Sequence, residues 1–150
     1  MIKMVGVIAT SILSIFLTAC AGERPKNLGV HDGRLSSCPS SPNCVSSQVT
    51  DGGHSIAPLA FNGDPDDAFT RLKQVFGRRK DTRIIEDSPG YLRVELRTTF
   101  FVDDGEFLLD RSGRVIHVRS ASRLGYSDVG KNRRRIEEIR RELLKTEVKP

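Results

Sequence analysis

Short turns between apolar runs constrain the fold of this chain more than any other feature. The runs cover residues 82–86, 91–101, 106–109 and 114–120. Asp, Ser, Pro and Gly dominate the sequences between them, as in turns that join neighbouring strands: Asp87-Ser88-Pro89-Gly90, Asp103-Asp104-Gly105 and Asp110-Arg111-Ser112-Gly113. Connections this short favour antiparallel pairing. With an edge strand at residues 56–61, interrupted by Pro58, we predict an antiparallel sheet of about four to five strands.

Alternation within the longest run assigns its two faces. Leu92, Val94, Leu96 and Phe100 are expected to face the core, and Arg93, Glu95 and Arg97 are expected to face out.

Two amphipathic helices accompany these strands. The first begins with Asp64 as N-cap and Pro65 at the first helical position, and it ends near Gly77. A second apolar stripe follows the last strand: Val129, Asn132, Ile136, Ile139 and Leu143. The order strand, helix, strands, helix predicts an α+β fold with both helices packed on one face of the sheet.

The first twenty residues have the pattern of an export signal. Lys3 precedes the apolar run 5–16, which is too short to span a bilayer as a helix. The sequence Leu17-Thr18-Ala19-Cys20 resembles the lipobox of bacterial lipoproteins, and this resemblance implies acylation of Cys20. An ordinary secretory leader is the alternative. We therefore expect a signal peptide over residues 1–19 and an envelope protein that faces the periplasm and is anchored to the membrane through Cys20. Because Ala21 rather than aspartate follows Cys20, the outer membrane is favoured.

Composition separates the rest of the chain into a spacer and one domain. Residues 20–37 are polar and glycine-containing and predict a flexible tether, followed by a single globular domain over 38–146 and a tail over 147–150. The net charge of +5 is compatible with an anionic surface but too small and too dispersed to indicate nucleic acid.

Cys38 and Cys44 remain once Cys20 is assigned to the anchor. An exported compartment is oxidising, and Pro39-Ser40-Ser41-Pro42-Asn43 is a turn-forming sequence, so a disulfide is predicted. Zinc, which prefers about four ligands, and a redox pair, which is more often C-x-x-C, are the alternatives. No metal or cofactor is expected.

The stretch 118–135 has the highest density of polar side chains. Three interpretations stay open: a structural clasp, an anion-binding site or a catalytic site. Asp128 or Ser127 would cap the last helix, and Asp128 would pair with Arg123 or Arg119 in a clasp. Arginines near an unpaired helix start suit a carboxylate or phosphate instead. The candidate ligand residues are Arg119, Ser122, Arg123, Tyr126, Ser127, Asp128, Asn132, Arg133 and, from a distant loop, His54.

Asn132 lies on the apolar stripe, so its amide must find partners in the strand or the loop under any of these interpretations. Catalytic templates fit poorly, because Val129 replaces the final glycine of a G-x-S-x-G elbow. A Ser/His/Asp set from Ser127 or Ser122 with His54 and Asp128 is the remaining enzymatic alternative.

Three segments together resemble the domain-of-unknown-function 1499 family over about residues 38–144. They are 38–47 (CPSSPNCVSS), the pattern H-x-I-x-P-L from His54, and the stretch from Val118 to Ile136. The resemblance implies an envelope or organelle-lumen domain without an established activity, and it assigns no catalytic residues. We expect a binding or structural module whose partner is an anionic envelope component or an envelope protein. A small hydrolase or transferase is the alternative.

Overall fold

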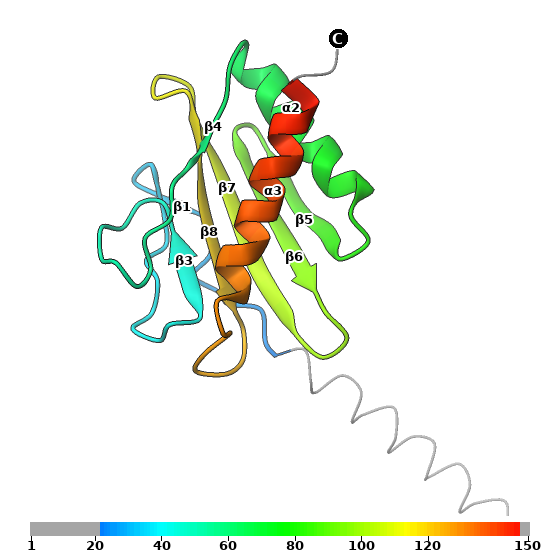
Figure 1. Cartoon of the computed structure of the whole chain (residues 1–150). Helices are drawn as coiled ribbons and strands as arrows, with labels where there is room; N and C mark the ends of the chain where they lie inside the picture. Colours follow the sequence, from blue (N-terminus) through cyan, green and yellow to red (C-terminus); the bar gives the residue numbers. More distant parts are fainter. Residues whose placement is uncertain (1–21, 148–150) are drawn as a thin grey trace, which may run out of the picture.

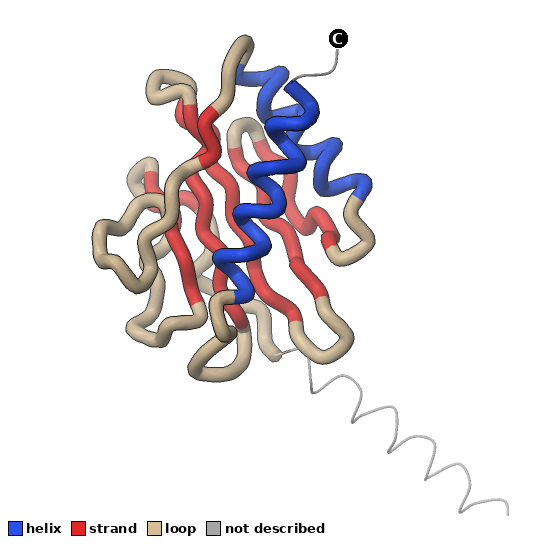
Figure 2. The backbone as a smooth tube through the Cα atoms, in the orientation of Figure 1, coloured by secondary structure: helices blue, strands red, loops and turns tan. Residues whose placement is uncertain are grey.

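The computed structural model describes residues 22–147. The expected signal peptide and Cys20 lie outside the described residues, as does most of the expected tail. A twisted antiparallel sheet forms one layer, and two helices cover one of its faces (Figures 1 and 2). Within residues 22–147, no helix has the length and apolar character needed to cross a membrane.

The main sheet has six strands, more than predicted, and the α+β class is confirmed. Its order is β3 (Cys44–Ser46), β8 (Val115–Ser122), β7 (Val102–Asp110), β6 (Tyr91–Arg97) and β5 (Thr82–Ser88), with β4 (Leu59–Ala60) also paired to β8. All of these pairs are antiparallel. A separate hairpin joins β1 (Val30–His31) to β2 (Arg34–Leu35). The extra strands have two or three residues, too few for alternation to be recognised.

Helices α2 (Pro65–Arg78) and α3 (Lys131–Glu147) bury their apolar stripes against the sheet. Asp64 caps α2 as predicted, because its side chain accepts hydrogen bonds from the backbone of Asp66 and Asp67. Phe76 of α2 packs against Phe107 of β7 in a tilted arrangement with ring centroids 4.8 Å apart, and both rings are fully buried. Helix α3 includes Glu147, which was predicted to begin the tail.

The turn predicted at residues 103–105 is wrong, because these residues lie inside β7. The actual β6–β7 turn spans residues 98–101, where Thr98 N donates to Phe101 O at 2.9 Å. Phe100 is therefore at a loop tip and 70 % exposed rather than in the core. Gly105 serves packing: a Cβ there would lie 2.9 Å from Cγ2 of Val94 on the neighbouring strand.

The predicted stripe of α3 is correct from Asn132 onward and wrong at Val129. Val129 lies before the helix, has a positive φ of 53° and is 81 % exposed. Gly130 follows with φ 73°, and α3 begins at Lys131. Two successive left-handed residues end the loop, so the helical period cannot extend back to Val129.

Residues 22–37 differ from the flexible tether expected from composition; we call them the N-terminal strap. The strap packs on the sheet face opposite the helices. Arg24 Nη2 lies 2.6 Å from Glu95 Oε1, and Gly29 N donates to Glu106 Oε1 at 2.7 Å. Leu35 is buried. The strap is ordered because carboxylates on this face, expected to be in solvent, are buried and require partners.

Candidate functional site

The polar stretch 118–135 divides between the two faces of the sheet. Side chains alternate along β8, so Ser120 and Ser122 face helix α3, whereas Arg119 faces the strap. Arg123, just past the strand, also lies on the strap side. Residues adjacent in sequence thus contribute to two separate clusters.

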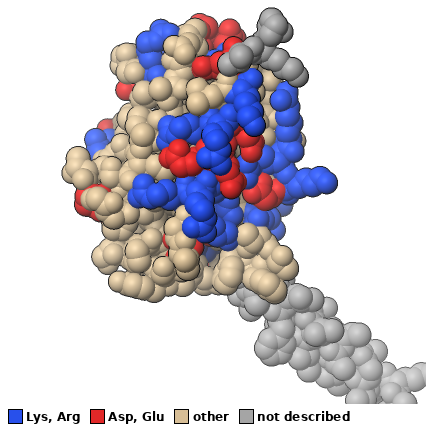
Figure 3. Space-filling view, viewed as in Figure 1, with Lys and Arg blue, Asp and Glu red and all other residues tan. Residues whose placement is uncertain are grey.

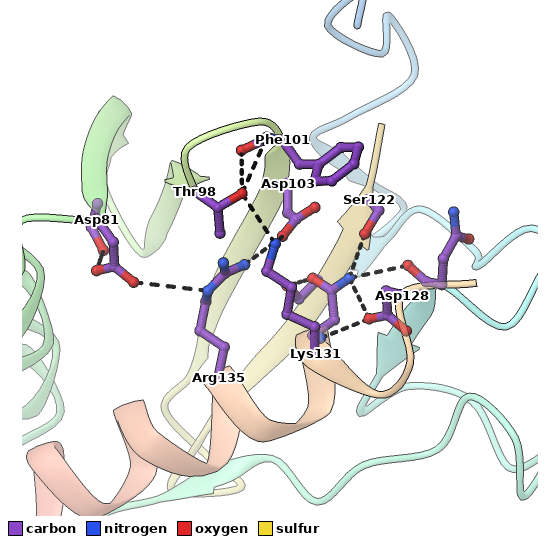
Figure 4. Close-up of polar contacts among 12 residues, drawn as sticks. Asp81, Thr98, Phe101, Asp103, Ser122, Asp128, Lys131 and Arg135 are labelled. Carbon is purple, nitrogen blue, oxygen red and sulfur yellow. Dashed lines mark hydrogen bonds and ion pairs between the residues drawn. The ribbon is translucent and has the colours of Figure 1, made fainter. Parts of the chain in front are cut away.

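Asn132 is the centre of the helix-side cluster and is fully buried. Its Oδ1 accepts a hydrogen bond from Ser120 Oγ at 2.5 Å. Its Nδ2 lies within hydrogen-bond distance of Ser122 Oγ (2.9 Å), Asp128 Oδ2 (2.8 Å) and Asn43 O (3.2 Å). Figure 4 shows where Ser122 and Asp128, two of these partners, lie at the start of α3. The prediction that Asn132 bonds the strand and the loop is confirmed, and Asn43 is an additional partner from the disulfide loop.

Asp128 caps α3 by accepting from Gly130 N at 3.0 Å and Asn132 N at 2.7 Å. Burial alone would raise the pKa of Asp128, but the hydrogen bonds from Asn132 and Gly130 outweigh burial and lower it. The predicted cap is confirmed. The predicted pairing of Asp128 with Arg123 or Arg119 is wrong, because both guanidiniums lie on the strap side.

Asp103 forms a second helix-side cluster that the sequence pattern did not predict. Arg135 Nη1 lies 2.6 Å and Lys131 Nζ 3.5 Å from its Oδ2, so two turns of α3 are fixed to β7 (Figure 4). Arg135 also approaches Asp81, with 3.9 Å between charged atoms. Within residues 22–147, Asp103 Oδ1 has no hydrogen-bond partner. Asp103 was assigned to a turn, which hid its place in the core.

The strap-side cluster holds the two predicted arginines in ion pairs. Arg119 Nη1 lies 3.3 Å from Glu106 Oε2, and Glu106 Oε1 accepts from Tyr91 Oη at 2.8 Å. Arg123 binds Asp104 through two nitrogens, at 2.7 and 2.8 Å, and Glu95 through Nη2 at 2.8 Å. Arginines expected to await an anionic ligand are therefore already neutralised by the protein's own carboxylates.

Glu95 receives the most cationic donors of these carboxylates. Arg24, Arg123 and Arg97 all donate to it, at 2.6, 2.8 and 2.5 Å. Burial would raise the pKa of Glu95, but these three arginines outweigh it and hold the pKa at about 2. The Arg123 pKa is raised above its ordinary value, first by its hydrogen bond to Asp104. Glu95 is thus a permanent anion at neutral pH.

One sequence signal for this cluster existed. Glu106 and Arg119 are direct cross-strand neighbours on β7 and β8, so opposite charges face each other in the register. This pairing can be recognised from the sequence only when the start of β7 is placed correctly. The turn wrongly predicted at residues 103–105 prevented that placement.

The other predicted residues lie elsewhere. Tyr126 is 76 % exposed at the tip of the β8–α3 loop, and Ser127 is exposed beside it. Arg133 donates to the backbone carbonyls of Ser55 and Gly53, at 2.8 and 3.2 Å, and so fixes the loop that carries His54.

His54 itself is engaged locally. Its Nδ1 lies 2.7 Å from Asp51 Oδ1 and its Nε2 3.1 Å from the carbonyl of Ser41. Both contacts raise the His54 pKa, the one to Ser41 most. In the part of the chain that the structure describes, neither ring nitrogen bonds Ser122, Ser127 or Asp128, so the Ser/His/Asp set is not assembled.

One cavity brings predicted residues together. It measures about 310 Å³ on the strap side, and its walls include Arg119, Ser122 and Arg123 together with Asp104 and Cys38. The predicted disulfide between Cys38 and Cys44 is present, with Cα atoms 5.7 Å apart. Arg119 Nε is buried and has no hydrogen-bond partner within residues 22–147. Over the same range, no three His, Cys, Asp or Glu side chains are grouped as metal ligands.

Comparison with known families agrees with the resemblance carried by residues 38–47, the pattern from His54 and the stretch 118–136. The profile of DUF1499, described as a protein of unknown function, matches residues 34–143. The chain belongs to this family. No curated protein and no solved structure gave a significant match. The match begins four residues before Cys38, within the strap of this DUF1499 domain.

Proposed function

We propose that this DUF1499 protein is a lipid-tethered protein of the bacterial cell envelope whose domain acts as a binding or structural module. One observation carries the proposal: the lipobox-like tetrad ends at Cys20, two residues before the ordered strap begins at Gly22. Acylation of Cys20 would hold the domain at a membrane surface.

The role as a module rather than an enzyme is supported by how the motif residues are used. Asn132, Asp128, Arg119 and Arg123 are bonded to other residues of the domain. These contacts fix α3 and the strap to the two faces of the sheet. Substrate chemistry would require reactive groups that are free to meet a substrate.

An anionic envelope component is the partner class that the exposed charge favours. Lys and Arg side chains gather over helices α2 and α3 (Figure 3). The exposed ones are Arg78, Lys80, Arg134, Arg141 and Lys145. These residues replace the buried arginines as the expected contact, because only exposed cations can meet a macromolecular partner without unfolding the clusters.

Metabolic labelling with radioactive palmitate tests the tether. The full chain expressed in a bacterium should incorporate label and sediment with membranes, and a Cys20→Ala variant should lose both properties. Density-gradient separation of the two membranes then tests the preference for the outer membrane. Equal labelling of both chains, or of neither, would overturn the proposal.

Retention on a polyanion column tests the partner class separately. The double variant R134E/R141E should elute at lower salt than the unaltered chain. Arg83 is an exposed arginine on β5, so R83E is the matched control for a single charge reversal on another element. Equal elution shifts for these variants, per charge reversed, would contradict a partner site on the helices.

A further inference from the structure

Exposed hydrophobic side chains concentrate at one end of the domain. Eight large hydrophobic side chains are exposed within residues 22–147, and five of them lie on the β6–β7 and β8–α3 loops. The five are Phe100, Phe101, Leu124, Tyr126 and Val129. The other three, Val30, Ile84 and Leu144, lie on three different elements. We call residues 98–101 and 123–130 the loop end.

The two loops form one surface. Lys131, just after the second loop, places Nζ 5.7 Å from the ring centroid of Phe101 and 3.4 Å from Thr98 Oγ1 (Figure 4). Arg123 N lies 3.4 Å from Val102 O at the base of the loops. These contacts hold the two loops together at one end of the domain, so their exposed aromatic and aliphatic groups belong to the same end.

The ordered chain also begins at the loop end. A Cβ on Gly22 would lie 3.0 Å from both Leu124 Cγ and Arg123 Cβ, so the start of the strap packs against the β8–α3 loop. Figure 1 shows the described chain starting beside the tips of both loops. One residue, Ala21, separates Gly22 from Cys20, so their Cα atoms are at most about 7 Å apart even in a fully extended chain.

We infer that the loop end is a membrane-contact surface, which seats the domain directly on the bilayer with Phe100, Phe101, Tyr126 and Val129 at the headgroup boundary. This inference rests on the proposed lipid tether at Cys20. An anchor within about 7 Å of Gly22 leaves no length for a spacer, so the surface beside Gly22 must meet the lipid.

The chemistry of the loop end fits an interface of anionic headgroups and acyl chains. Aromatic and aliphatic side chains occupy such boundaries, and nearby cations add attraction to anionic lipids. Four cations lie on or next to the segments that form this end: Lys131, Arg97, Arg24 and Arg134. Arg24 and Arg97 are paired with Glu95 and Lys131 with Asp103, whereas Arg134 donates to the carbonyl of Val129. Glu23 is an exposed carboxylate at the same end. In Figure 3 the end beside the start of the described chain is mainly uncharged, and the cations lie above it.

Site-directed spin labelling of the full, lipidated chain tests this inference. With Cys20 acylated and Cys38 bonded to Cys44, a cysteine introduced by Y126C is the single free thiol. A nitroxide there should become several-fold less accessible to a water-soluble relaxant when the protein is inserted into phosphatidylglycerol–phosphatidylethanolamine vesicles. The matched control is L144C, because Leu144 is exposed near the opposite end of α3. Its accessibility should not change.

A second variant set separates membrane contact from other causes of protection. Adding F100S and F101S to Y126C should restore relaxant access, whereas adding V30S and I84S should not. Unchanged access at position 126 in vesicles, with palmitate still on Cys20, would overturn the membrane surface and leave the tether standing. Protection already present in detergent micelles and dependent on protein concentration would instead indicate contact between copies of the chain, and would also overturn it. Failure of palmitate labelling would remove the tether and this inference together.

Discussion

Arg123 donates two parallel hydrogen bonds to the Asp104 carboxylate, Nε to Oδ2 at 2.7 Å and Nη2 to Oδ1 at 2.8 Å. The pair joins the end of β8 to the start of β7, and Arg123 also binds Glu95 on β6. Such a fork is the strong geometry for an arginine–carboxylate pair. The three neighbouring strands are thus cross-linked on the face that the strap covers.

Substitution of Arg123 by alanine should destabilise the domain rather than remove a ligand. The change leaves two buried carboxylates without this donor, and breaking a buried ion pair costs about 3–5 kcal/mol. Urea unfolding of the full chain, followed by circular dichroism, measures the loss. Arg83→Ala, at an exposed position on β5, should stay within about 0.5 kcal/mol of the unaltered chain. Unchanged stability of Arg123→Ala would revive the ligand-site interpretation.

Glu95 should make the domain sensitive to acid. Its pKa is held at about 2 in the folded chain by three arginines, against an ordinary value of 4.5. Because the folded pKa is lowered, the linked stability is present above pH 4.5 and is lost as the pH falls toward 2. The difference corresponds to about 3 kcal/mol. Urea midpoints from pH 7 to pH 2 test this.

Comparison with Glu95→Gln isolates the carboxylate. The variant should be less stable than the unaltered chain at pH 7, and the gap should narrow as the pH falls below 4.5. Asp67→Asn, at an exposed position on α2 away from these arginines, is the control and should change the acid profile much less than Glu95→Gln. A constant gap between Glu95→Gln and the unaltered chain at every pH would refute the assignment.

Asn132→Ala should also unfold the domain more easily. The amide satisfies Ser120 Oγ and contacts the carbonyl of Asn43, and both partners are buried. Each buried polar group left unpaired costs about 1–3 kcal/mol. Thermal or urea unfolding checks the result, with Arg141→Ala on the exposed side of α3 as the matched control. A loss no larger than that of the control would show that the amide is dispensable.

Local signals predicted the parts of the fold that local chemistry determines. Helix α2 was anticipated from its Asp64–Pro65 start and its apolar stripe, and both features act within a few residues. The start of β7 was not predicted. Asp103-Asp104-Gly105 has the composition of a turn, but partners far along the chain hold it in a strand. Arg135 and Arg123 supply those partners from 32 and 19 residues away.

The candidate site was only partly predictable for the same reason. Adjacency in sequence grouped Arg119, Ser122 and Arg123 with Asn132, but alternation along β8 sends them to opposite faces of the sheet. The strap was also missed, since its order depends on Glu95 and Glu106, more than 70 residues away. The composition of the strap shows only that its residues are polar. It carries no information about buried carboxylates elsewhere in the chain.

The Cys38–Cys44 disulfide should leave no accessible thiol in the described domain of the exported protein. Maleimide labelling without reductant should be absent, and reduction should expose both thiols. Replacing both cysteines by serine should lower stability by about 2 kcal/mol, the entropic contribution expected for closing so short a loop.

The Cys38–Cys44 disulfide also anchors the loop that carries Asn43. When Asn132→Ala is added to the variant without the two cysteines, the further loss of stability should therefore be smaller than the loss that Asn132→Ala causes in the unaltered chain. Strictly additive losses of stability would argue against that link.

His54 should titrate above its ordinary pKa of 6.5. The carbonyl of Ser41 contributes most to the rise, and Asp51 adds to it. A raised folded pKa means that the linked stability is complete below pH 6.5 and is lost as the pH increases through the folded value. NMR titration of the imidazole should give a midpoint above 6.5, and Asp51→Asn should lower it. Asp67→Asn, which removes a carboxylate that does not bond His54, should leave the midpoint unchanged. Covalent reaction of Ser122 or Ser127 with a fluorophosphonate would contradict this local role, because that reaction requires an activated serine beside a free imidazole.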